Sequence, residues 1–236
     1  MPILYLIPTP IAESALHALP AQTIEIARHL DFFIAERAKT ARHFLKAIGV
    51  ARPLPEVEVV EIDDKSPQVA ADALKQAFQQ GRNVGLVSEA GCPGVADPGA
   101  DVAALAHRMG MTVQPLTGPS SLILALMASG MNGQQFAFHG YLSPKRPELA
   151  RDLQKLEQQS ERARQTQLFI ETPYRSQMVL ETALTALRPD TLFCVAQHLT
   201  GPDEWVCSLP VSEWKKRPPV VLPKAPAVFL LYRCPV

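Results

Sequence analysis

Short apolar runs alternate with segments of helical periodicity along the chain. In the first half, a helix is predicted over residues 67–80, with Ser66 as its cap and Gly81 at its end, and another over 98–109, ended by Gly110. The apolar runs between them are short enough to be strands. They cover residues 3–7, 32–35, 84–88 and 112–116. Such alternation is typical of a parallel sheet covered by helices.

The second half repeats the alternation. Helices are predicted over residues 120–129, 147–159 and 173–187, and strands over 135–139, 167–171, 191–196, 205–209 and 227–233. The break is best placed at Thr117-Gly118-Pro119, where a strand ends and a turn begins. We therefore expect an α/β protein of two lobes, residues 1–116 and 117–236. Each lobe would hold a mixed or parallel sheet with flanking helices, and a ligand would bind in the cleft between them.

Composition narrows the functional classes. Hydrophobic residues make up 47% of the chain and charged residues 19%, which is the composition of a globular protein. Because the net charge is zero, nucleic acid could be bound only through a local basic patch. No apolar stretch is as long as a membrane span, and the start of the chain does not resemble a signal peptide. The cysteines show neither zinc-site nor disulfide-framework spacing, so we expect no metal and a cytoplasmic location. They are Cys92, Cys194, Cys207 and Cys234.

The most informative segment is SEAGCPGVADPG, residues 88–99, which follows an apolar strand and precedes a helix. The carboxyl edge of a sheet is where open α/β folds bind ligands. Three glycines allow a ligand to approach the backbone closely, and two prolines stiffen the loop. Asp97 is also placed to cap the following helix. A plain turn would need fewer special residues, so a binding loop is the preferred interpretation.

Three other joints resemble this loop in position. PTPI follows the first strand at residues 8–11, and LTGPSS presents two hydroxyls at a helix start at residues 116–121. LFIETPYR, residues 168–175, places Glu171 at a strand end with Arg175 shortly after it. Together these joints predict several strand ends that converge on one ligand.

These segments, in this order and spacing, resemble the tetrapyrrole methylase superfamily of S-adenosylmethionine enzymes, over residues 4–232. Within it, the ribosomal RNA methyltransferases are the most similar group. The resemblance implies a homodimer and S-adenosylmethionine bound in a folded conformation between the lobes. Many relatives carry aspartate where Cys92 stands, so backbone contacts are expected there. By position, the implied cofactor contacts are Pro10, Ile11, Ala90, Gly91, Cys92, Val95, Ser120, Ser121, Glu171, His198, Leu199 and Ala227.

The chain departs from the ribosomal RNA enzymes at two motifs. It has Ala12-Glu13 where they have Gly-Asn, and the sequence ERAK at residues 36–39 where they have Glu-Asp-Thr-Arg. The relatives also run on beyond the last predicted strand. The substrate is therefore less constrained by the resemblance than the cofactor is.

Methyl transfer to a neutral hydroxyl needs a base to remove a proton. The candidates are Glu36, at the end of the second strand, and Glu89, in the loop. An ion pair with a nearby cation is the alternative role for Glu36, and a loop-stabilising hydrogen bond is the alternative for Glu89. His43 is expected on a solvated helix face, and His139 is expected to be satisfied within a strand.

Three functions remain open. Methylation of a ribose in ribosomal RNA predicts a basic patch, and its candidates are Arg37, Lys39, Arg42, Lys145 and Arg146. Methylation of a small tetrapyrrole-like acid predicts an enclosed pocket with one or two arginines. A module that binds the cofactor without catalysis would need only the four loop motifs. Methylation of a ribose in ribosomal RNA is the preferred function.

Overall fold

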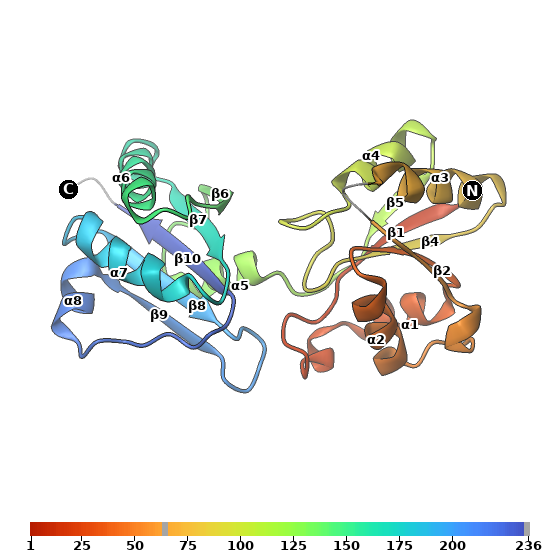
Figure 1. Ribbon diagram of the computed structural model, residues 1–236, viewed down its shortest axis with the longest axis horizontal. Helices are drawn as coiled ribbons and strands as arrows, with labels where there is room; N and C mark the ends of the chain where they lie inside the picture. Colours follow the sequence, from red (N-terminus) through yellow and green to blue (C-terminus); the bar gives the residue numbers. More distant parts are fainter. Residues whose placement is uncertain (63–65, 234–236) are drawn as a thin grey trace. The chain divides into compact units, whose positions relative to one another are not determined.

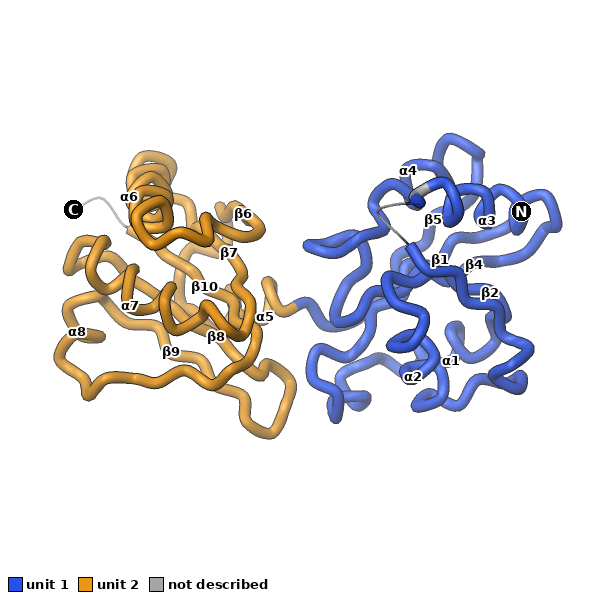
Figure 2. Tube along the Cα trace, in the orientation of Figure 1, with its two compact units in different colours: residues 1–120 blue, residues 121–236 orange. Residues whose placement is uncertain are grey.

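The structure is a computed structural model that describes residues 1–62 and 66–233 (Figure 1). The chain divides into two compact units, Met1–Ser120 and Ser121–Val236 (Figure 2). No described helix is both long and apolar enough to cross a membrane.

Unit 1 is built on a sheet in which every pairing of neighbouring strands is parallel, in the order β3-β2-β4-β1-β5. Residues of β2 and β4 are buried along both strands, because helices cover both faces of the sheet. The strands are β1 (Ile3–Ile7), β2 (Phe32–Ala35), β3 (Glu58–Glu61), β4 (Val84–Val87) and β5 (Thr112–Pro115).

Two helices pack on each face of this sheet (Figure 1). One face carries α1 (Ala21–His29) and α2 (Ala38–Ile48), whose Phe44 and Leu45 pack with Phe33 of β2. The other carries α3 (Pro67–Gln79) and α4 (Ala100–Arg108). Two short 3-10 turns, η1 (Leu16–Ala18) and η2 (Leu54–Glu56), complete the unit.

Unit 2 is built on a mixed sheet in the order β6-β7-β10-β8-β9. Only β6 and β7 are parallel, and their register is irregular between Phe138 and Tyr141. The remaining pairs are antiparallel. The strands are β6 (Phe136–Tyr141), β7 (Thr166–Glu171), β8 (Leu192–Gln197), β9 (Trp205–Pro210) and β10 (Ala227–Tyr232).

The helices of unit 2 cover both faces of that sheet. On one face lies α5 (Ser121–Ser129). On the other lie α6 (Arg146–Ala163), α7 (Ser176–Ala186) and α8 (Val211–Lys216), which enclose an aromatic core. In that core Phe169 stacks on Phe229, with ring centroids 5.3 Å apart.

The predicted α/β class with two sheets is confirmed, Ser66 is at its predicted cap position, and two predicted helix starts are wrong. The helix predicted from residue 98 begins at Ala100, and its cap position is Gly99, at φ 125°, instead of Asp97. Ser66 stands at the cap position of α3 without a side-chain hydrogen bond. The helix predicted from residue 173 begins at Ser176.

Candidate functional site

The strands of the unit 1 sheet run parallel and end on the same side, so their following loops leave one edge, and four of these loops carry the predicted site. They follow β1, β2, β4 and β5. These are the segments in which the sequence places the first half of the predicted site.

The loops after β1 and β4 are joined by an isolated antiparallel bridge between Thr9 and Gly91. The Thr9 amide donates to the Gly91 carbonyl at 2.9 Å, and the Gly91 amide donates to Thr9 at 3.1 Å. Two hydroxyls reinforce the bridge. Thr9 Oγ1 donates to the Ser88 carbonyl at 3.3 Å, and Ser88 Oγ donates to Gly91 at the same distance. The glycine-rich loop is therefore anchored at its base.

The loop after β5 joins the other two through Cys92 and Gly118. Cys92 Sγ lies 3.5 Å from the carbonyl oxygen of Pro119, as a donor to it. Burial raises the pKa of the Cys92 thiol, which keeps the side chain neutral. A Cβ at Gly118 would lie 2.3 Å from the Pro8 Cβ, so only glycine allows the two loops to lie this close.

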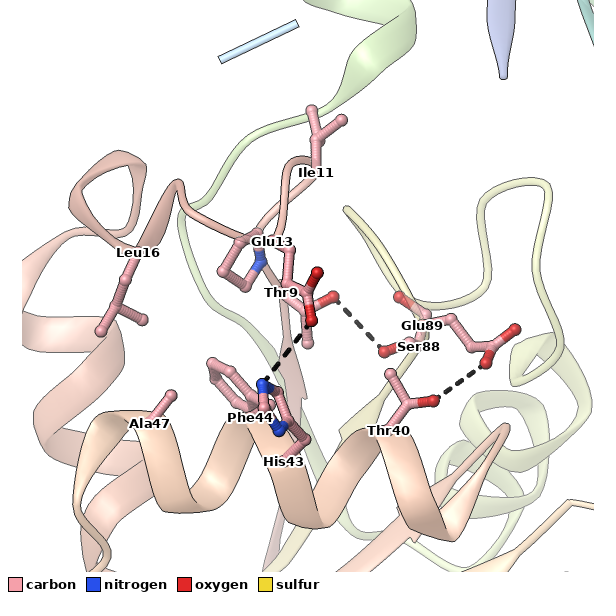
Figure 3. A pocket seen from close by; sticks show the side chains of 11 residues that line it. Thr9, Ile11, Glu13, Leu16, Thr40, His43, Phe44, Ala47, Ser88 and Glu89 are labelled. Atoms are coloured by element: carbon pink, nitrogen blue, oxygen red, sulfur yellow. Dashed lines mark hydrogen bonds and ion pairs between the residues drawn. The ribbon is translucent and has the colours of Figure 1, made fainter. Parts of the chain in front are cut away.

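Between α2 and these loops lies a cavity of about 250 Å³ (Figure 3). Phe44, Leu16 and Ile11 give it apolar walls, while Glu13, Thr40 and Glu89 add polar groups. Thr40 Oγ1 donates to Glu89 Oε1 at 3.0 Å, and His43 Nε2 lies 3.8 Å from Glu13 Oε1. The lining residues are Thr9, Pro10, Ile11, Glu13, Leu16, Thr40, His43, Phe44, Ala47, Ser88 and Glu89.

Three carboxylates interact at this edge of the sheet. The Glu89 amide donates to Glu36 Oε2 at 3.4 Å. Burial raises the pKa of Asp97 to about 6, and repulsion by Glu36 and Glu89 adds to the shift, against an opposing hydrogen bond with Ser88. Asp97 therefore lies close enough to both candidate bases to be repelled by them. The sequence did not indicate this proximity, because Asp97 was assigned to a helix cap. Among residues 1–62 and 66–233, no group of three or more His, Cys, Asp or Glu could hold a metal ion.

Unit 2 brings its predicted cofactor residues to one edge of its own sheet. Ala227, the first residue of β10, pairs with Glu171 at the end of β7 and with Gln197 at the end of β8. His198 and Leu199 follow directly after Gln197, and Leu199 is buried in the core cluster that includes α5. Ser121 is the first residue of α5, and Ser120 closes unit 1.

The side chain of Glu171 is already engaged. It accepts a hydrogen bond from the Thr172 amide at 2.6 Å and forms an ion pair with Arg175.

The turn after β8 is strained and holds polar atoms that sequence reasoning did not single out. His198 and Thr200 have φ of 53° and 69°, a region that residues with a side chain rarely occupy. Gln197 Oε1 and Thr200 Oγ1 are buried without a hydrogen-bond partner among the described residues. Strain and unpaired polar atoms of this kind gather at ligand sites.

The predicted basic residues fall into two groups. Arg37 is the cap residue of α2, on which Lys39 and Arg42 are exposed. Lys145 and Arg146 stand at the start of α6, where each is paired with a carboxylate. Lys145 Nζ lies 3.5 Å from Glu148, and Arg146 lies 2.8 Å from Glu181.

The two histidines differ in their surroundings. His43 is exposed and lines the cavity. His139 Nε2 on β6 is hydrogen-bonded to Gln167 Oε1 on the neighbouring strand β7 at 2.6 Å, so this ring nitrogen is satisfied within the sheet.

The chain matches a known family along most of its length. The model of the tetrapyrrole (corrin/porphyrin) methylases matches residues 4–214. Three proteins named ribosomal RNA small subunit methyltransferase I are each 30% identical to it. The match to the Bacillus subtilis protein covers 85% of this chain and 64% of that protein. The match to the Escherichia coli O157:H7 protein covers 89% of this chain and 70% of that protein. For Leptospira biflexa it covers 97% of this chain and 90% of that protein.

Solved structures share the fold. The methyltransferase CobJ superposes with a TM-score of 0.62 at 17% identity, over 98% of this chain and 93% of that one. Cobalt precorrin-4 methyltransferase CbiF superposes with a TM-score of 0.60 at 15% identity, over 98% of this chain and 94% of that one. Uroporphyrin-III C-methyltransferase from Thermus thermophilus, solved with S-adenosylhomocysteine, gives 0.56 at 15% identity, over 98% and 97%.

The family model and the relatives agree with the loop motifs from which the resemblance was first drawn. The chain belongs to the tetrapyrrole (corrin/porphyrin) methylase family, whose members are S-adenosylmethionine-dependent methyltransferases.

Proposed function

We propose that this chain uses S-adenosylmethionine to methylate a ribose hydroxyl in small-subunit ribosomal RNA. The observation that carries the proposal is its similarity to three methyltransferases named for that RNA, one of them matched over 97% of the chain. The proposal further places the protein in the cytoplasm as a homodimer.

The proposed cofactor contacts come from both units. In unit 1 they are the loop residues Pro10, Ile11, Ala90, Gly91, Cys92, Val95 and Ser120. In unit 2 they are Ser121, Glu171, His198, Leu199 and Ala227. The anchored glycine-rich loop supports this set, since Ala90 and Val95 are exposed beside the bridge at Gly91. The unpaired oxygens of Gln197 and Thr200, adjacent in sequence to His198 and Leu199, support it in unit 2.

The cofactor, when bound, supplies a methyl group on an already activated sulfonium, so the protein must align the acceptor and remove its proton. Glu89 is the proposed base, because its carboxylate lines the cavity and is oriented by the Thr40 hydroxyl. Glu36 supports Glu89 by accepting a hydrogen bond from its amide. Replacing a positioned base usually costs roughly 10²–10⁴ in rate.

The substrate contacts proposed for RNA are Arg37, Lys39, Arg42, Lys145 and Arg146. Lys145 and Arg146 would have to exchange their present carboxylate partners for phosphates. The residues on α2 need no such exchange.

Transfer of labelled methyl groups tests the function. The purified chain is incubated with labelled S-adenosylmethionine and either small ribosomal subunits or a small-molecule extract. The proposal expects label in the RNA, and much less of it with Glu89→Gln at unchanged affinity for S-adenosylhomocysteine. Label in the small-molecule fraction alone would favour a tetrapyrrole-like acceptor. No label in either fraction, with cofactor bound, would favour a binding module without catalysis.

A further inference from the structure

The exposed side of α2 carries a row of basic residues. Lys39, Arg42, His43 and Lys46 follow one another at spacings of three, one and three residues, which places them along one side of a helix. All four side chains are exposed. The opposite side of α2 is packed into the core through Phe44 and Leu45, so the row stands on a fixed element.

Three members of the row, Lys39, Arg42 and Lys46, lack the partners that other basic residues of unit 1 have. Lys39, Arg42 and Lys46 form no hydrogen bond or ion pair with another residue in the described ranges. By contrast, Arg28, Lys75 and Arg82 are each paired with a carboxylate. An exposed row of unpaired positive charge is complementary to a polyanion.

The row lines an open hollow of about 530 Å³, together with Glu13, Thr40 and Leu54. Glu13, Thr40 and His43 line this hollow and the cavity at the glycine-rich loop alike. Figure 3 shows Thr40 and His43 extending from α2 among the residues that line the cavity, with Glu13 facing His43. An anion held on the row would therefore lie beside the entrance to the cavity.

We propose that Lys39, Arg42 and Lys46 form a phosphate-binding track that holds an RNA strand while one of its nucleotides reaches the cavity. The inference rests on the proposed function and names the surface that receives its substrate. Lys39 and Lys46 are roughly 10 Å apart along the helix axis, at 1.5 Å per residue. That length and the openness of the hollow suit successive phosphates of a chain better than one enclosed carboxylate. Lys145 and Arg146, which are already paired, are not part of the track.

The experiment compares two variants of equal charge. In the track variant, Lys39→Ala, Arg42→Ala and Lys46→Ala are combined. In the control, Arg151→Ala, Arg162→Ala and Lys215→Ala remove three exposed cations from helices of unit 2. Alanine favours helix, so both should fold, and calorimetry with S-adenosylhomocysteine checks that they do. Affinity for a single-stranded RNA oligonucleotide is measured by fluorescence anisotropy at several salt concentrations.

The track variant is expected to lose about two units from the slope of log affinity against log salt, since each phosphate contact on a single strand contributes about 0.7. At 0.1 M salt this corresponds to roughly a hundredfold weaker binding. The control should match the wild-type slope. An unchanged slope in the track variant would overturn the inference, even if the wild type methylates RNA.

The proposed function can fail separately. Salt-dependent RNA binding through the track, without methyl transfer to RNA by the wild type, would support the track and count against the function. A porphyrin tetracarboxylate that binds the wild type more tightly than RNA, and loses this affinity in the track variant, would overturn the assignment to a phosphate chain.

Discussion

At the scale of single residues, Gly91 connects backbone conformation with cofactor binding. Its φ of 76° lies in the left-handed region, and its amide and carbonyl are both bonded to Thr9. A Cβ would find space there, since the nearest atom, the Pro119 carbonyl oxygen, is 3.6 Å away. A side chain would therefore act through backbone strain and by covering the loop surface, and not by a clash.

Gly91→Val should weaken binding of S-adenosylhomocysteine by roughly tenfold or more, or about 1.4 kcal/mol, in isothermal titration calorimetry. Gly110→Val is the matched control, because Gly110 has φ of 75° and open space around it. Both variants should lose about 1–3 kcal/mol of stability through strain. Equal cofactor affinity in the two variants would mean that the loop is only a turn.

Asp97, in the same loop, makes the stability of the protein depend on pH. Its pKa is raised to about 6 from an ordinary value of 3.8, so between about pH 4 and 6 the folded protein holds a proton that the unfolded chain has lost. The free energy of unfolding therefore falls as the pH rises through this window. Above the window, the full destabilisation from the charged Asp97 carboxylate is present.

Asp97→Asn removes this cost. The variant should be more stable than the wild type at pH 8, and the gain should disappear as the pH falls to 4. Thermal denaturation at several pH values measures the difference. Asp101→Asn replaces an exposed carboxylate nearby and serves as the control. A gain that does not change with pH would show that Asp97 does not titrate in this window.

At the scale of elements, the site depends on how closely the loops after β1 and β5 approach each other. Gly118→Ala would bring a Cβ to 2.3 Å from the ring of Pro8. Overpacking of this kind costs about 1–3 kcal/mol. Urea denaturation should show that loss for Gly118→Ala but not for Gly133→Ala, since Gly133 has no atom within 4 Å of the added carbon. Equal stability of the two variants would contradict the close approach.

Strongly periodic helices and fully apolar strands could be predicted from the sequence, and elements with few apolar residues could not. β2 and β4 were found because all their residues are buried and apolar. β3 was missed because it is an edge strand, with exposed glutamates at both ends. α1 was missed because its apolar residues are few and flanked by polar ones. The start of α4 was misplaced because Gly99, at φ 125°, stands at its cap position instead of Asp97.

At the scale of the whole molecule, loop positions could be predicted from strand ends, whereas interactions between loops could not. The loop that carries Glu89, Gly91 and Cys92 could be located from one motif. The hydrogen bond from the Thr40 hydroxyl to Glu89 joins residues that are 49 positions apart in the sequence. The side-chain oxygens of Gln197 and Thr200 are unpaired because they are buried in the folded chain. No local sequence pattern predicts that burial.

Exposed apolar residues of unit 2 bear on the proposed dimer. Ile123 and Met127 of α5 are 44% and 74% exposed, and Phe136 of β6 is 41% exposed. Light scattering at micromolar concentration should report a dimer, and Met127→Glu should shift it towards monomer by burying a charge in an apolar interface. A monomeric wild type would contradict the proposal.

The position of the transferred methyl group tests the central claim most directly. Small-subunit RNA labelled by the wild-type chain is digested to nucleosides, which are identified by mass spectrometry. The account predicts one nucleoside with the label on its ribose, absent when Glu89→Gln replaces the wild type. Label on a base, or on no nucleoside while a small acid is methylated, would contradict it.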